Sequence, residues 1–503
     1  MPTSPSDPYD YDLAVVGAGA AGLAGAVTAA EAGLTVALLD SAAHTGGQYF
    51  RHPAPALGAA RPQALHHDWP AYAALRERLA ASSVKHLPGH HVWTLTRQAE
   101  DRWTVLALTG DDGEADEPVT LRARSVLLAT GAYERQLPFP GWTLPGVVGA
   151  GGVQAMLKSG LVLPGRRIVV AGSGPLLLAV ASSLATAGAT VPAVVEAAGY
   201  LGYARHPRAL AANPGKLREA VIHGSALLRH RVPLHTRSVV TQVHGTDRVE
   251  AVTVARTDRN WRPVPGTGRR IACDALATGH GLVPQVELAT TLGCATRRTP
   301  DGTTALVLDD LQRTSLPGLW AAGEPGGIGG WELARTEGEL AGLAVAARLG
   351  GRPLLTGGTR LRTLRRDRAR LRAFAEAMAT AHAPGTGWTR WLTDDTDVCR
   401  CEEVTAGRVR EAARDLGAHD ARTVKLLTRA GMGWCQGRMC GQAVACLAAE
   451  GTAEGTVPPS AERRPLAVPV PLGALGSVPT EPADPTHHDA PAERPTTERP
   501  TAP

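Results

Sequence analysis

The segment from Tyr11 to Asp40 constrains the fold of this chain more than any other feature. It reads YDLAVVGAGAAGLAGAVTAAEAGLTVALLD, which predicts a strand, a glycine-rich turn, a helix, a second strand and a terminal acid. Gly17 permits the tight turn, Gly19 lets a pyrophosphate approach the backbone, and Gly22 allows the helix to pack closely on the sheet. Asp40 is placed to accept a hydrogen bond from a ribose hydroxyl. We therefore predict a dinucleotide-binding α/β unit here.

A second segment, from Arg166 to Gly199, repeats the pattern of strand, turn and helix. Gly172 and Gly174 form its turn, but Leu177 replaces the third glycine, so helix and strand cannot pack as closely. Glu196 follows the second strand and favours a free ribose 2′-hydroxyl, which makes NAD the preferred ligand over NADP. Two alternatives stay open, namely a site that holds an adenine nucleotide only structurally and a site that holds nothing.

Four cysteines near the C-terminus form two pairs, Cys399-x-Cys401 and Cys435-x4-Cys440. Two pairs supply two thiolates for each iron of a [2Fe–2S] cluster. Glycines surround the second pair and let backbone amides hydrogen-bond to the sulfur atoms. Structural zinc also accepts four cysteines, although its first pair is more often C-x2-C, so zinc stays open as the alternative metal. The remaining cysteines have apolar neighbours and are expected to be buried.

Composition and charge exclude several classes of protein. The chain has 503 residues and 44% hydrophobic residues, which predicts about three globular domains. No apolar stretch approaches the roughly 20 residues of a membrane span, and the N-terminus lacks the features of a signal peptide, so a cytoplasmic protein is expected. The arginine-rich run from Arg360 to Arg372 predicts a basic helix. We interpret it as a solvated face or a docking surface for an acidic partner, and expect no nucleic acid, because no recognised motif accompanies it.

The segment from Thr314 to Glu324, TSLPGLWAAGE, resembles the closing motif of two-dinucleotide flavoproteins. In that family the acid after the glycine binds the ribitol of FAD; here Glu324 follows Gly323, where aspartate is usual. The resemblance implies that the next helix directs its N-terminus, at Gly330 and Trp331, towards the flavin. The segments HTGGQYF and LLATGAYERQLPFPGW are similar to other parts of this family and imply FAD contacts from Gly47, Gln48, Thr130 and Gly131.

The predicted flavin has no redox cysteine pair beside it. Disulfide reductases of this fold carry C-x4-C just after the first acid, where this chain has HTGGQYF, and the C-x-x-C of thioredoxin-reductase-like proteins is absent from the inserted domain. Electrons must therefore use a nicotinamide, a substrate, another flavin or the cluster. A flavin accepts two electrons and can release them singly, whereas a [2Fe–2S] cluster carries one. Tyr49, Trp142 and Trp331 are candidates to flank the flavin ring.

The order of these motifs closely resembles that of the large (alpha) subunits of opine oxidases, hydrogen cyanide synthase and D-hydroxyproline dehydrogenase. The resemblance covers most of Tyr11 to Ala449 and extends to the segment from Arg464 to Gly476. The cysteine region is similar to bacterioferritin-associated-ferredoxin-like modules. In this family a D-amino-acid-oxidase-like beta subunit carries its own FAD and oxidises the amine. The resemblance thus implies a hetero-oligomer and an electron acceptor, and leaves open an FMN at the subunit boundary.

We therefore predict an α/β protein with two Rossmann-like domains in the glutathione-reductase-like arrangement, and a small helical [2Fe–2S] domain. The FAD domain takes residues 1–158 and 282–351 and encloses a nucleotide-binding domain at 159–281. A helical connector at 352–397 leads to the cluster domain at 398–451, and a proline-rich segment at 452–503 is expected to be disordered beyond about 477.

Three functions are compatible with the sequence. The leading hypothesis is the electron-transfer subunit of an FAD-dependent amine or amino-acid dehydrogenase of the opine, hydroxyproline or glycine type. The second is a self-sufficient NAD(P)H-dependent reductase that passes electrons through the cluster. The third is a flavin- and cluster-binding module that no longer turns over. The sequence marks no catalytic side chain, so the chemistry is assigned to the flavin.

Overall fold

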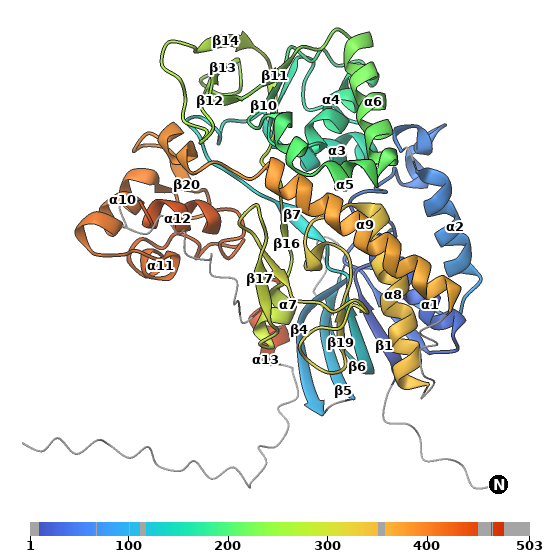
Figure 1. Cartoon of the computed structure of the whole chain (residues 1–503). Helices are drawn as coiled ribbons and strands as arrows, with labels where there is room; N and C mark the ends of the chain where they lie inside the picture. Colours follow the sequence, from blue (N-terminus) through green and yellow to red (C-terminus); the bar gives the residue numbers. More distant parts are fainter. Residues whose placement is uncertain are drawn as a thin grey trace, which may run out of the picture.

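The computed structural model describes residues 10–66, 68–99, 101–110, 117–350, 358–450, 464 and 466–476. Two sheets, one above the other in Figure 1, form the body of this part of the chain, and a small helical unit lies beside them. The tail that we expect to be disordered falls outside the described residues.

The first sheet has the order β3-β2-β1-β6-β5-β4, with β19 also paired to β6. Strands β1, β2, β3, β6 and β19 are parallel, whereas β5 and β4 extend the sheet as antiparallel strands. All of β2 and the last four residues of β1 are buried, as expected for parallel strands covered on both faces. The strands are β1 (Tyr11–Val16), β2 (Val36–Leu39), β3 (Lys85–Leu87), β4 (His90–Ala99), β5 (Arg102–Thr109), β6 (Glu117–Leu128) and β19 (Leu319–Ala321).

Two helices cross closely on one face of this sheet. They are α1 (Ala20–Glu31), which follows the first glycine turn, and α8 (Trp331–Leu349), which follows β19 (Figure 1). A Cβ atom on Gly338 of α8 would lie 2.1 Å from the carbonyl oxygen of Ala21, so only glycine permits this approach. The predicted strand, turn, helix and strand from Tyr11 to Asp40 are confirmed. Helix α2 (Trp69–Ala80) packs on the outer side of α1.

The second sheet is parallel throughout and has the order β11-β10-β9-β15-β8. A three-stranded antiparallel sheet, β12-β13-β14, completes this part. The strands are β8 (Val147–Gly149), β9 (Ile168–Gly172), β10 (Val194–Glu196), β11 (Leu234–Thr236), β12 (Ser238–His244), β13 (Ala251–Arg256), β14 (Arg269–Ala272) and β15 (Ala275–Gly279). The helices are α3 (Ala150–Gly160), α4 (Leu176–Thr186), α5 (Pro207–Ala211) and α6 (Pro214–Arg229).

Two short strands connect the sheets, β7 (Ala132–Glu134) on the way out and β16 (Leu282–Pro284) on the way back. The outgoing domain boundary predicted from the sequence is Lys158, in α3. Because β8, which precedes α3, pairs with β15, the strand pairing favours a boundary between β7 and β8 instead. The second predicted boundary, at which the chain returns to the FAD domain near residue 281, stays a prediction and agrees with the position of β16. Three short elements follow β16, namely α7 (Glu287–Thr291), β17 (Thr296–Arg298) and β18 (Thr304–Leu306).

The arginine-rich run lies in α9 (Thr359–Ala381), a long helix that packs against α8 and crosses towards the second sheet (Figure 1). The cluster domain follows as β20 (Asp397–Cys399), β21 (Val404–Thr405), α10 (Ala406–Asp415), α11 (Ala421–Thr428) and α12 (Gly441–Ala448). Its core is continuous with that of the inserted domain, since Trp142 and Trp261 belong to the same buried cluster as Trp391 and Cys399. The final element is α13 (Leu472–Gly476). In the part of the chain that the structure describes, no helix is long and apolar enough to cross a membrane.

Candidate cofactor sites

The first glycine turn has one open position between two crowded ones. Gly17 has φ +105°, and a Cβ atom there would lie 2.4 Å from the carbonyl oxygen of Ala129. A Cβ atom on Gly22 would lie 1.7 Å from the carbonyl oxygen of Gly17, so this glycine is required by packing. At Gly19 the nearest atom to the Cβ position is the Cα of Gly47, at 3.9 Å. The space at Gly19, before the N-terminus of α1, therefore fits a pyrophosphate.

Asp40 and the GGQYF segment enclose this turn. The Asp40 carboxylate accepts hydrogen bonds from the amides of Ala18 and, at 2.7 Å, Ala42, so it also fixes the turn. A Cβ atom on Gly47 would lie 3.0 Å from the Cα of Gly19, which brings this predicted contact residue against the turn. The next residue, Gln48, accepts a hydrogen bond from Arg51 at 2.7 Å. Two predicted FAD contacts, Asp40 and Gly47, thus lie against one turn, and the binding roles of these residues and of Gln48 stay predictions.

Thr130 and Gly131 lie where the chain leaves the first sheet. The Thr130 hydroxyl donates to the carbonyl oxygen of Gln285 at 2.6 Å, and the Gln285 amide donates to the carbonyl oxygen of Gly131 at 3.0 Å. Gly131 has φ +75° and open space around its Cβ position. These two residues therefore join the outgoing and returning connections at the base of the first glycine turn.

Glu324 is directed towards backbone amides of its own loop. Its carboxylate accepts from the amide of Gly329 at 2.8 Å and from that of Gly330 at 3.0 Å. Burial raises the pKa of this carboxyl, and the two amide hydrogen bonds oppose the rise. The family resemblance predicts that the Gly330 amide faces the flavin. In the structure this amide instead donates to the carboxylate of Glu324, whose side chain is one methylene longer than the usual aspartate. Gly323, which has φ +81°, donates its amide to Glu337 at 3.0 Å.

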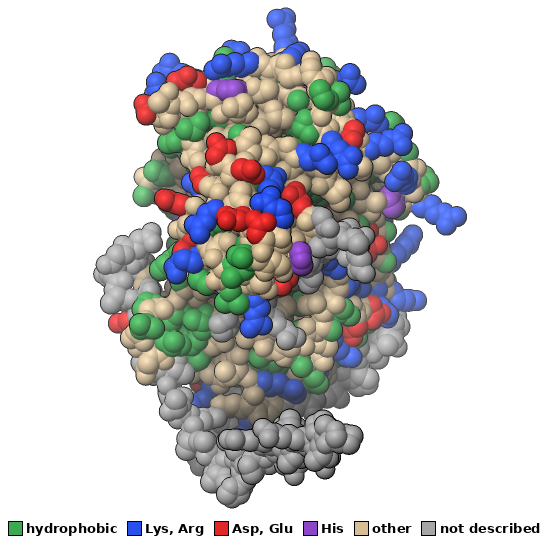
Figure 2. Space-filling view, turned by 90° about the vertical axis from the view of Figure 1, so that its left-hand side faces the viewer, with side chains coloured by type: hydrophobic (Ala, Val, Ile, Leu, Met, Phe, Trp, Pro, Cys, Tyr) green, Lys and Arg blue, Asp and Glu red, His purple; other side chains and the backbone are tan. Residues whose placement is uncertain are grey.

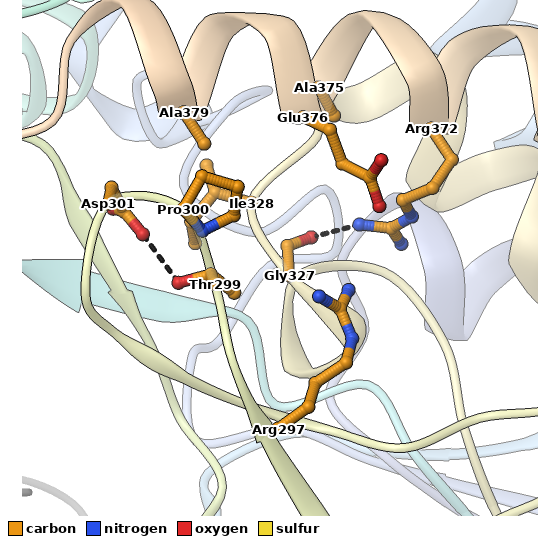
Figure 3. A pocket seen from close by; sticks show the side chains of 10 residues that line it. All are labelled: Arg297, Thr299, Pro300, Asp301, Gly327, Ile328, Arg372, Ala375, Glu376 and Ala379. Carbon is orange, nitrogen blue, oxygen red and sulfur yellow. Dashed lines mark hydrogen bonds between the residues drawn. The ribbon is translucent and has the colours of Figure 1, made fainter.

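Two arginines of α9 contact this loop and α8, which corrects the interpretation of that helix as a solvated or docking face for these two residues; Arg360, Arg362, Arg365 and Arg366 are exposed. Arg368 and Arg372 contact one oxygen of the fully buried Glu337 at 3.3 Å and 2.6 Å. The same Arg372 donates to the carbonyl oxygen of Gly327 at 2.6 Å, and Arg297 donates to that of Gly326 at 2.9 Å. Figure 3 shows the guanidinium groups of Arg297 and Arg372 beside a small pocket at this loop. The basic run therefore braces the loop that leads into α8.

Aromatic rings gather where α8 begins. Trp331 is 7% exposed, its indole nitrogen donates to Asp68 at 2.9 Å, and its ring lies 6.1 Å from that of Tyr49. Lys158, at the end of α3, donates to the Tyr49 carbonyl at 3.1 Å and lies 5.4 Å from the Tyr49 ring centre. Trp142, the third aromatic candidate, lies elsewhere, because its indole nitrogen donates to Asp397 next to the cysteine region. Trp331 and Tyr49 thus stay candidates to flank the flavin.

Sequence reasoning missed Lys158. The available signal was its rarity, because lysine occurs at only four positions in the chain. Burial lowers the pKa of its ammonium group to about 8, and no acidic partner opposes this effect. An ammonium group held in such surroundings loses its proton much more easily than an exposed lysine.

We predict a pH-dependent stability difference between the wild type and Lys158→Met. The folded-state pKa of about 8 is below the ordinary value of 10.5, so the unfolded chain binds more protons between these pH values. Wild-type stability should therefore rise relative to the variant from pH 8 to 10.5, by about 3 kcal/mol in the limit. Denaturant unfolding of both proteins at pH 7.5 and pH 10 measures this, and a constant difference would contradict it.

The second glycine turn is covered by the chain itself. Glu196 is 1% exposed, and its carboxylate accepts from the amides of Gly174 at 2.9 Å and Ala198 at 2.8 Å. His382, just after α9, lies over it with Nδ1 3.6 Å from Glu196 and 3.4 Å from the hydroxyl of Ser173. The position where Glu196 was expected to meet a ribose is therefore occupied by protein atoms.

Other features of this second turn keep the dinucleotide geometry. Gly172 has φ +141°, and a Cβ atom there would lie 1.7 Å from the carbonyl oxygen of Gly279, so this glycine is required. Gly174 has φ +115° and open space at its Cβ position. Leu177 is 1% exposed and packs with Val170 and Val180 in the core of this domain. The Leu177 side chain thus fills space between helix and sheet, whereas a glycine at this position would let α4 lie closer to the sheet.

The four cysteines of the two pairs come together in the cluster domain. The sulfur atoms of Cys401 and Cys435 are 3.9 Å apart, and the Gly431 amide donates to the sulfur of Cys399 at 3.4 Å. Hydrogen bonding with Cys440 lowers the pKa of the Cys399 thiol to about 5. Four thiols converge here, and the sulfur of Cys399 accepts a hydrogen bond from a backbone amide, so the site fits an iron–sulfur cluster. In the described residues, no group of three or more histidine, cysteine, aspartate or glutamate side chains is arranged so that it could hold a metal ion.

The cysteine site reaches the surface on one side. Cys399 and Cys440 are buried, whereas Cys401 is exposed. Trp434, immediately before Cys435, has 81% of its surface exposed. Figure 2 looks onto the side of the molecule on which the cluster domain lies in Figure 1, where acidic and basic side chains are interspersed with apolar ones. The remaining cysteines are less accessible, since Cys273 and Cys294 are buried, as predicted, and Cys446 is half-buried.

Two protein-family models match the chain. Residues 11–338 match the pyridine nucleotide-disulphide oxidoreductase model, and residues 398–450 match a BFD-like [2Fe-2S] binding domain. The chain belongs to the pyridine nucleotide-disulphide oxidoreductase family. The two matches imply FAD and a [2Fe–2S] cluster as the cofactors, so zinc is no longer needed to explain the cysteines. The predicted fold class is confirmed.

Named relatives of this oxidoreductase cover most of its length. It is 34% identical over 442 residues to hydrogen cyanide synthase subunit HcnB of Pseudomonas aeruginosa, covering 85% of this chain and 90% of the relative. It is 32% identical over 450 residues to an opine oxidase subunit of Rhizobium meliloti, covering 88% and 82%. The structure of L-proline dehydrogenase from P. horikoshii shares the fold, with a TM-score of 0.62, 21% identity, and coverage of 92% of this chain and 79% of that one.

In this pyridine nucleotide-disulphide oxidoreductase, two separate groups of residues would hold the two cofactors. Gly17 to Gly22 and Asp40 would hold the dinucleotide of FAD, and the two cysteine pairs would hold the cluster. FAD supplies two-electron chemistry when bound, and the cluster supplies one-electron transfer. The family resemblance predicted from the sequence is confirmed.

Proposed function

We propose that this chain is the electron-transfer subunit of an FAD-dependent amine or amino-acid dehydrogenase, in which a partner subunit oxidises the substrate. The observation that carries this proposal is the covered second glycine turn. His382 and Glu196 occupy the place where a nicotinamide dinucleotide would approach Ser173 and Gly174. A chain that cannot readily take electrons from NADH must receive them from elsewhere.

The relatives support an assembly with more than one kind of subunit. The hydrogen cyanide synthase and opine oxidase relatives are named as subunits, which supports a hetero-oligomer for this chain too. We propose a partner that resembles D-amino-acid oxidases and carries its own FAD, with an FMN at the boundary as a further candidate. No redox cysteine pair stands in the HTGGQYF segment, so a dithiol substrate has no matching group beside the flavin.

The chain's own residues would then have three tasks. Gly19 and the amides at the start of α1 hold phosphate, and Trp331 and Tyr49 flank one end of the flavin site. Lys158 holds or releases a proton at its Nζ atom close to neutral pH. Gly431 directs its amide to the sulfur of Cys399 and stabilises negative charge there.

The self-sufficient NAD(P)H reductase is the second candidate function. The preserved Gly172 and the open space at Gly174 favour it, because both are features of a dinucleotide turn. The buried Glu196 argues against it, since no ribose can reach a carboxylate that is 1% exposed. A module without turnover is the weaker alternative, because the first glycine turn has open space at Gly19 and the thiols of the two cysteine pairs converge.

The test is anaerobic reduction of the isolated chain, followed by its visible spectrum. We expect neither NADH nor a panel of proline derivatives, opines and glycine to bleach the bound FAD within seconds. Addition of the D-amino-acid-oxidase-like subunit should then confer dye-linked dehydrogenase activity. Rapid bleaching by NADH would favour the self-sufficient reductase, and substrate turnover by the isolated chain would place the amine site here and overturn the proposal.

A further inference from the structure

A buried carboxylate lies between two arginines where the cluster domain meets the FAD domain. Glu287, the first residue of α7, has 2% of its side chain exposed and accepts from Arg438 at 3.0 Å. The same carboxylate oxygen accepts from Arg464 at 2.9 Å. The two arginine side chains are 14% and 7% exposed, respectively. Three distant parts of the chain thus meet in one buried charged group, which we call the Glu287 clamp.

Both arginines of the Glu287 clamp also hold the loop between Cys435 and Cys440. Arg464 donates through Nε to the carbonyl oxygen of Gln436 at 2.9 Å. Arg438 donates to the carbonyl oxygen of Cys435 at 3.4 Å. Gln436 has φ +52°, a left-handed conformation that costs free energy for a residue with a side chain. The clamp therefore fixes the backbone directly behind a cluster ligand.

The C-terminal segment attaches the clamp to the first sheet. The Thr291 hydroxyl of α7 donates to the carbonyl oxygen of Arg464 at 2.6 Å. The Ala467 amide donates to the carbonyl oxygen of Trp93 in β4 at 2.9 Å, and Arg438 donates to the Ala467 carbonyl. Ala474 packs in the same apolar cluster as Trp93. Residues 466–476 thus lie along the FAD domain and place Arg464 against the cluster loop.

We propose that Glu287, Arg438 and Arg464 are positioning residues that fix the cluster loop on the FAD domain and set the reduction potential of the [2Fe–2S] cluster. Groups behind the ligands orient them and tune the metal centre, and a buried charge acts strongly because water does not screen it. Reduction adds one negative charge to the cluster. A nearby positive charge therefore raises the potential, and a nearby negative charge lowers it.

If the Glu287 clamp sets the reduction potential of the cluster, removal of a negative and of a positive charge should shift that potential in opposite directions. A purely structural ion pair would not give this dependence on charge. Glu287→Gln removes a negative charge and should shift the cluster potential to more positive values. Arg464→Met removes a positive charge and should shift it to more negative values. The measurement is an anaerobic redox titration of the holoprotein, in which the electron paramagnetic resonance signal of the reduced cluster is followed.

The matched control is Glu31→Gln. Glu31 pairs with Arg78 at 2.8 Å between α1 and α2, on the surface of the FAD domain, so the same change of charge is made away from the cluster. Its potential should equal that of the wild type. Unchanged potentials in both clamp variants, or shifts of the same sign, would overturn the proposal.

A second comparison covers the case in which Glu287→Gln does not fold. Arg464→Lys keeps the positive charge that Arg464→Met removes. The lysine variant should return the potential towards the wild-type value, and equal potentials in the two Arg464 variants would overturn the proposal. This inference rests on the cluster and not on the partner subunit, so the two proposals can fail separately.

Discussion

Replacement of Cys435 by serine is expected to remove the iron–sulfur cluster while FAD stays bound. Cys435 supplies one of the four convergent thiols, and a serine hydroxyl stays protonated at neutral pH and does not replace a thiolate. The residues around Gly19 belong to the first sheet and should keep FAD. Purified without oxygen, the wild type should contain about two iron and two sulfide per chain, and the variant neither. Iron, sulfide and extractable FAD are measured on both proteins.

Cys446→Ser is the matched control for this change. Cys446 is half-buried in α12 of the same domain, and its sulfur is 3.7 Å from the amide nitrogen of Gln442. This variant loses a thiol but should retain all of the iron. Stoichiometric zinc without sulfide in the wild type, matured with active cluster assembly, would contradict the cluster assignment.

Gly338→Ala should destabilise the FAD domain by about 3 kcal/mol, the upper part of the usual range for overpacking. The new Cβ atom would lie 2.1 Å from the carbonyl oxygen of Ala21, so α1 and α8 would have to move apart. Since α1 begins at the first glycine turn and α8 begins at Trp331, this movement should also weaken FAD binding. Denaturant unfolding and the temperature at which FAD is released measure the two effects.

Gly224→Ala in α6 is the control for the change of glycine to alanine in a helix. No atom lies within 4 Å of the Cβ position of Gly224, and alanine is the better helix former. This variant should be more stable than the wild type, by about 0.5–1 kcal/mol. Equal destabilisation by both substitutions would show that the close crossing of α1 and α8 is not the cause.

The sequence alone was enough for the features that depend on neighbouring residues. The strand, glycine turn and helix from Tyr11 to Asp40 are local, because φ at Gly17 and the apolar run of each strand follow from adjacent side chains. The two cysteine pairs predicted the cluster for the same reason, since spacing within each pair limits the reach of the thiols. The family followed from the order of these motifs along the chain.

Only the tertiary structure shows which distant residues contact those motifs. Ser173 and His382 are 209 residues apart, and their contact covers a glycine turn that the sequence presented as a nucleotide site. Glu287 and Arg464 are separated by 177 residues, and no periodicity or motif relates them. Such contacts depend on how whole helices and sheets pack, and buried charges pair with whichever partner that packing brings near. The sequence by itself therefore determined the cofactors and the fold class, and the packing decided which sites are open and what holds the cluster loop.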